Sequence, residues 1–123
     1  MDGESRGYVK RSGGAAVEHE IACTQQLARF FPRAVAVRIP VEVTALRGSG
    51  AKLREATVLE FGGTEHAIFL CTLPVEFNDH LRLERDSQGG VADATVIAVQ
   101  YHQGRKAVAV KFDQPPCDWV TKP

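Results

Sequence analysis

The chain has 123 residues, with 15 basic and 15 acidic side chains and a formal net charge of zero. This length suits one domain with its own hydrophobic core, and the balanced charge argues against a general binder of nucleic acids or membrane surfaces. The polar N-terminus "MDGESRGYVKRSGG" lacks the apolar stretch of a signal peptide, and no apolar run approaches the ~18 residues of a membrane span. We therefore expect a cytoplasmic protein without membrane insertion.

Residues 1–28 are predicted to be a flexible leader, because the chain begins with small and polar residues that show no periodicity. The segment "AVEHEIACTQQLARFF", residues 16–31, could form a short helix, since its apolar residues fall roughly on one side. Pro32 would end this helix, because the residue before a proline is pushed out of the helical region.

The remainder of the chain predicts six short strands separated by turns. Apolar and polar residues alternate in these stretches, as expected for strands with one buried face. The predicted strands cover 34–46, 51–60, 65–71, 80–86, 91–101 and 105–112. The glycine-rich stretches "RGSG", "FGG" (61–63), "SQGG" and "HQG" predict turns between them. This spacing is typical of an all-β antiparallel barrel or sandwich, and Trp119 is expected to plug one end of its core.

Candidate residues for catalysis or metal binding do not combine into a site. The four histidines are scattered without zinc-ligand spacing, and the serines lie in tail or turn sequence without a nucleophile elbow. The three cysteines, an odd number without paired spacing, are typical of buried or free thiols in a reducing cytosol. We therefore expect neither an enzyme nor a metal site, and no cofactor.

Two arginines, Arg29 and Arg33, bracket "FFP" immediately before the first predicted strand. Guanidinium groups suit phosphate oxygens and the N7/O6 edge of guanine, and their flat faces stack on bases. About one Arg-x-x-x-Arg pair is expected by chance in a sequence of this composition, so the spacing alone carries little information. The residues leave two interpretations open: an anion clamp on a short mobile segment, or two solvated arginines at a helix end.

The order of these parts resembles the PilZ family, bacterial receptor domains for cyclic di-GMP. The resemblance covers 29–120 and is carried by "RFFPRAVAVRIPVEV", "AKLREATVLEFGGTEHAIFL", "LPVEFNDHLRLE" and "VADATVIAVQYHQGRKAVAVKF". It implies a six-stranded antiparallel β-barrel domain at 29–120. It also implies that Arg29 and Arg33, which match the family's first ligand motif, contact the phosphates and guanines of the dinucleotide.

The family's second ligand motif, Asp or Asn, x, Ser, x, x, Gly, is altered here. Without a gap its positions fall on Leu59, Phe61 and Thr64; with the glycine matched to Gly63 they fall on Val58 and Glu60. Neither alignment supplies the acid and the serine together, so weakened or altered binding is expected. A carboxylate can accept from a guanine edge, and glycines permit close backbone approach. The candidate ligand-binding residues are therefore Arg29, Arg33, Glu60, Gly62 and Gly63.

Two functional hypotheses follow from this pattern. In the first, the chain is a signalling receptor in which cyclic di-GMP bridges the arginine segment and the barrel, and so changes the surface offered to a protein partner. In the second, a degenerate PilZ-like module binds no nucleotide and serves as a protein-interaction adaptor. An exposed Phe61 beside Phe30 and Phe31 would supply an apolar patch for such a partner. DNA is not an expected partner in either case.

Overall fold

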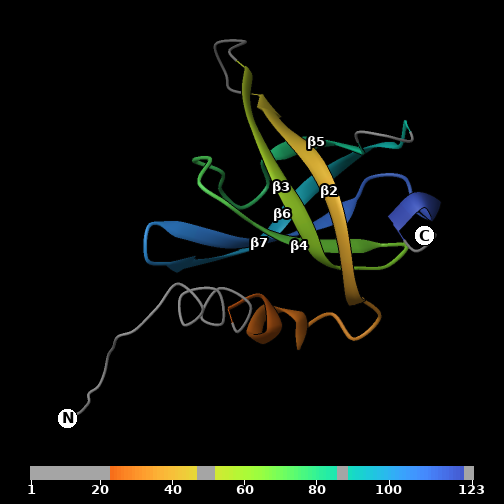
Figure 1. Cartoon of the computed structure of the whole chain (residues 1–123), viewed down its shortest axis with the longest axis horizontal. Coiled ribbons are helices and arrows are strands. Elements are labelled where there is room, and N and C mark those ends of the chain that lie inside the picture. The colour runs from red at the N-terminus through yellow and green to blue at the C-terminus, as the bar shows by residue number, and fades with distance from the viewer. Residues whose placement is uncertain (1–22, 47–51, 86–88, 121–123) are drawn as a thin grey trace.

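The structure, a computed structural model, describes residues 23–46, 52–85 and 89–120. Six antiparallel strands close into a barrel in the order β2-β3-β4-β7-β6-β5 (Figure 1). The strands are β2 (Val35–Leu46), β3 (Lys52–Gly62), β4 (His66–Cys71), β5 (His80–Arg85), β6 (Val91–His102) and β7 (Arg105–Phe112). This fold confirms the six-stranded antiparallel β-barrel that was predicted. None of the helices in the described part of the chain is long and apolar enough to cross a membrane.

Alternation along the strands, interrupted by bulges, fills the barrel interior. On β2, Val41 and Val43 are buried, and on β5 the register places Leu83 directly opposite Val43 where these two strands close the barrel. Phe69 on β4 and Phe112 on β7 are the largest fully buried side chains. Apolar burial contributes about 25 cal/mol per Å², so this interior is the main source of the barrel's stability.

The end of β3 differs from the sequence-based prediction. The prediction of a turn over "FGG" is wrong for Phe61 and Gly62, because both belong to β3 and pair with neighbouring strands. Gly62 lies opposite Val35 on β2 and Ala67 on β4. A register irregularity between Leu59 and Phe61, a β-bulge, accompanies this extension. The bulge matters for the site, since it changes the side of the sheet from which Phe61 projects.

A short helical segment, residues 23–28, lies against the outside of the barrel (Figure 1). It belongs to the helix expected at 16–31; residues 16–22 and the leader before them lie outside the described residues. Leu27 and Cys23 are buried in a second hydrophobic cluster with outward-facing residues of β4 and β7, Ile68 and Ala109 among them. The helical segment ends at Ala28, three positions before the predicted end at Phe31.

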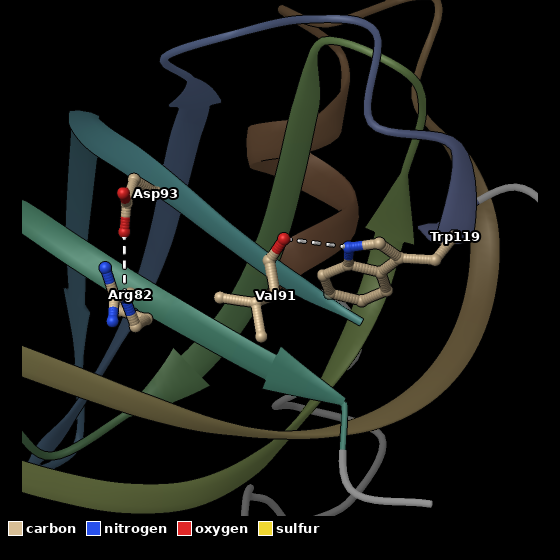
Figure 2. Close-up of polar contacts among 4 residues, drawn as sticks. All are labelled: Arg82, Val91, Asp93 and Trp119. Atoms are coloured by element: carbon tan, nitrogen blue, oxygen red, sulfur yellow. Dashed lines mark hydrogen bonds and ion pairs between the residues drawn. The ribbon is translucent and has the colours of Figure 1, made fainter. Parts of the chain in front are cut away.

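The C-terminal part packs across one end of the barrel. In the 3₁₀ helix Asp118–Val120, the half-buried Trp119 packs against the main core, as predicted. Its indole Nε1 donates to the carbonyl oxygen of Val91 at 3.4 Å (Figure 2). A Cβ on Gly90 would lie 2.7 Å from the indole ring, so this close contact requires a glycine. The Arg85 guanidinium donates to the Trp119 carbonyl oxygen at 3.2 Å and so helps to hold the 3₁₀ helix in place.

Candidate functional site

The fold brings the arginine segment to the end of β3. A Cβ on Gly63 would lie 2.8 Å from the Arg33 carbonyl oxygen, so the backbone of Arg33 packs directly on this glycine. Gly63 also donates its N–H to the carbonyl oxygen of His66 at 2.9 Å. The open side of Gly62 is filled by Val120. The close approach expected at Gly62 and Gly63 therefore occurs, but Val120 and the backbone of Arg33 make it, not a ligand.

The two arginines project from an exposed turn. The Arg33 side chain is 82% exposed and its Nη1 lies 3.6 Å from Glu65 Oε2. Exposed ion pairs of this kind contribute at most about 1 kcal/mol, so Arg33 can exchange Glu65 for another anion at little cost. Arg29 is also exposed. This turn therefore offers two cationic groups to solvent beside the end of β3.

Glu60 is held by the helical segment. The hydroxyl of Thr24, which is fully buried, donates to Glu60 Oε1 at 2.8 Å. This bond joins residues 36 positions apart and fastens the segment to β3. Thr24 has no motif that would have identified it from the sequence. Its bond to Glu60 forms only when the segment docks on β3, and the spacing of residues along the sequence does not reveal this docking.

Phe61 is packed rather than exposed, which corrects the expected apolar patch. Phe61 and Phe31 are half-buried against the second hydrophobic cluster, and of the three phenylalanines only Phe30, at 76%, is largely exposed. The reason is that the helical segment covers this face of β3 and β4. The Phe61 ring is therefore part of the segment's docking surface.

His66 completes the surroundings of Arg33. Its ring lies 4.9 Å from the ring of Phe31 at an angle of 47°. Burial lowers the pKa of His66, Lys111 and Arg33 act in the same direction, and Glu65 opposes them. His66 was not among the residues predicted from the sequence. His66 contacts Phe31 only because the fold brings the two rings together, so no sequence pattern marks it.

Nucleophilic side chains in the described residues lie away from this turn's surface. Cys23, Cys71 and Cys117 are free and buried, and burial raises the pKa of each thiol. No group of three or more potential metal ligands occurs within the ranges that the structure describes. The chemistry that the turn can supply is the binding of an anion by two guanidinium groups.

Comparison with known proteins assigns no family to the chain. No family model matches it, and no curated protein matches it.

Proposed function

We propose that the chain is a PilZ-like receptor domain that binds cyclic di-GMP through Arg29 and Arg33. The observation that carries this proposal is the position of Arg33: its backbone packs on Gly63 while its side chain is 82% exposed. An arginine that is fixed at its backbone and held at its charged end only by a weak, exposed ion pair with Glu65 is suited to grip a phosphate with little loss of entropy. The closed antiparallel barrel also agrees with the fold that the resemblance implies.

In this proposal, ligand binding competes with the helical segment for Glu60. The Glu60 carboxylate can accept hydrogen bonds from the N1 and N2 groups of a guanine, but Thr24 already donates to it. A guanine that binds both oxygens of this carboxylate competes with Thr24 for Oε1 and so weakens the bond that holds the segment to β3. The dinucleotide would thus change the surface offered to a protein partner.

Calorimetric titration with cyclic di-GMP at moderate salt tests the proposal, with GTP as the control ligand. The expected result is heat that saturates at micromolar cyclic di-GMP, with none from GTP. Arg29→Ala and Arg33→Ala should each abolish measurable binding. Arg38→Ala is the matched control, because Arg38 is also exposed but lies within β2 instead of in the turn. Binding that survives both turn substitutions contradicts the proposed clamp.

One observation favours a second function, that of a protein-interaction adaptor. The helical segment covers Phe61 and occupies Glu60, so the face where a nucleotide would lie is already filled. A flat calorimetric trace up to high micromolar cyclic di-GMP supports this alternative. Arg29, Arg33 and the exposed Phe30 would then form part of a surface for a protein partner.

A further inference from the structure

A second site lies on the opposite side of the barrel from the helical segment. It is a pocket of about 590 Å³ on the outer face of β2, β3, β5 and β6. The segment packs over β4 and β7, which the strand order places across the barrel from β2 and β5. This volume is within the range of small-molecule sites, about 300–1,000 Å³.

The floor of this pocket is a threonine set between two arginines. Thr44 on β2 lies opposite Arg54 on β3 and opposite Arg82 on β5. The neighbours of Thr44 along β2, Val43 and Ala45, are buried in the core, so Thr44 faces outward. Adjacent strands are about 4.8 Å apart, so the long side chains of Arg54 and Arg82 start on either side of Thr44 and are able to reach its hydroxyl.

The Thr44 hydroxyl is buried without a hydrogen-bond partner. The residue is 8% exposed, and its Oγ1 has no donor or acceptor within reach among the described residues. Two half-buried threonines differ: Thr57 Oγ1 donates to the Leu70 carbonyl oxygen at 2.6 Å, and Thr95 Oγ1 donates to Asp113 Oδ1 at 2.7 Å. Buried hydroxyls are nearly always satisfied. An unused donor at the floor of a pocket indicates a ligand that accepts from it.

Both arginines are held only by exposed partners. Arg82 Nε lies 3.0 Å from Asp93 Oδ1, as Figure 2 shows across β5 and β6, and Arg54 Nη1 lies 3.6 Å from Glu42 Oε1. Their side chains are 56% and 59% exposed. Such pairs contribute little, so either guanidinium can leave its carboxylate and turn toward a ligand at Thr44.

The pocket lining carries charges of both signs. Lys52, Arg54 and Arg82 are cationic, and the carboxylates are Glu84, Asp93 and Asp113, of which Asp93 pairs with Arg82. A phosphate monoester, with three terminal oxygens and a charge of about −2, can use the Thr44 hydroxyl and these cations more fully than a carboxylate with two oxygens. Carboxylates accept hydrogen bonds, which suits hydroxyl groups on the rest of the ligand.

We propose that this pocket binds a small phosphate monoester that carries hydroxyl groups, a sugar phosphate in chemical class. The phosphate lies between Arg54 and Arg82 and accepts from the Thr44 hydroxyl, and the sugar hydroxyls donate to the carboxylates. This site is separate from the turn that holds Arg29 and Arg33.

Ribose 5-phosphate is the probe for a test by amide chemical shifts, with ribose and inorganic phosphate as controls at equal ionic strength. Ribose 5-phosphate should shift the amides of residues 44, 54 and 82 and saturate, whereas ribose should shift none. Inorganic phosphate should shift the same amides at least about fivefold more weakly, because it has no groups for the carboxylates. Absence of these shifts with ribose 5-phosphate overturns the site. Equal affinity for inorganic phosphate overturns the assignment of a sugar.

Substitution of Thr44 shows whether its hydroxyl binds a ligand or stabilises the fold. Thr44→Val should weaken ribose 5-phosphate binding at least about fivefold, about the contribution of one hydrogen bond, while the Tm of the free protein stays the same or rises. Thr57→Val, the matched control, should lower the Tm and leave binding unchanged, since its hydroxyl has a partner. A fall in Tm for Thr44→Val equal to that of Thr57→Val contradicts an unused hydroxyl. Arg54→Gln, at an exposed position, gives a second variant that should also weaken binding.

Discussion

The barrel interior and the helical segment on its outer face are both hydrophobic clusters, but they differ in how they are held. The main core draws on all six strands and on the C-terminal 3₁₀ helix. The segment contributes only Cys23 and Leu27 as fully covered apolar side chains, together with the Thr24–Glu60 bond and a 3.3 Å contact between Gln26 and Gln100. Regions with few buried contacts open locally at lower free energy than the global unfolding. The segment is therefore the part of the described structure best suited to move.

The largest effect is expected from the barrel interior. Phe69 is fully buried at the centre of the core, and Phe69→Ala should lower the free energy of unfolding by about 3–5 kcal/mol through lost burial and a cavity. Equilibrium denaturation in urea measures this loss. A loss below about 1 kcal/mol would mean that the barrel does not depend on this core.

A smaller effect is expected from the segment. Leu27 is 6% exposed, yet Leu27→Ala should cost the whole domain only about 1–2 kcal/mol, because the segment can detach before the barrel unfolds. The same variant should make the Cys23 thiol react faster with a thiol reagent, with Cys71 in the barrel unchanged. If Leu27→Ala costs as much as Phe69→Ala, the two regions unfold as one unit.

A pH-dependent effect is expected where the two regions meet, at His66. Its pKa in the folded protein is below the ordinary value of 6.5, so the unfolded chain binds a proton more readily between these two values. Stability from His66 is thus fully present above about pH 6.5 and is lost as the pH falls toward the folded pKa. Denaturation at several pH values checks this, and His66→Gln should reduce the loss. A stability that rises on acidification through this window would contradict a half-buried, neutral ring.

The smallest effect on stability is expected from the exposed turn. Arg33→Ala removes a 3.6 Å ion pair with Glu65 between exposed side chains, and should change the free energy of unfolding by less than about 1 kcal/mol. A thermal melt of the variant beside the wild type measures this. A large fall in Tm would show that Arg33 is a structural residue, and the loss of nucleotide binding in this variant could then not be assigned to contact with the ligand.

The sequence predicted the barrel more fully than it predicted the sites. Alternation depends on neighbours along the chain, so strands such as β2 could be recognised from apolar residues two positions apart. The extension of β3 through Gly62 was missed, because a glycine pair is typical of a turn and only the packing of Val120 explains a glycine within this strand.

The contacts that define the two sites depend on distant partners. The Thr24–Glu60 bond joins the segment to β3 and has no sequence signature. No sequence pattern marks Thr44 either, because an outward-facing threonine in a strand is normally solvated. Only the register, with Arg54 and Arg82 on either side, identifies its position as the floor of a pocket.

The central claim is that cyclic di-GMP binds at the arginine turn and releases the helical segment. The most direct measurement is the rate at which each cysteine reacts with a thiol reagent, with and without saturating cyclic di-GMP, located by peptide mass spectrometry. Cys71 and Cys117 in the barrel core serve as internal controls. Saturating ligand should accelerate the reaction of Cys23 alone. Calorimetric binding of the ligand with an unchanged or slower Cys23 reaction would contradict it.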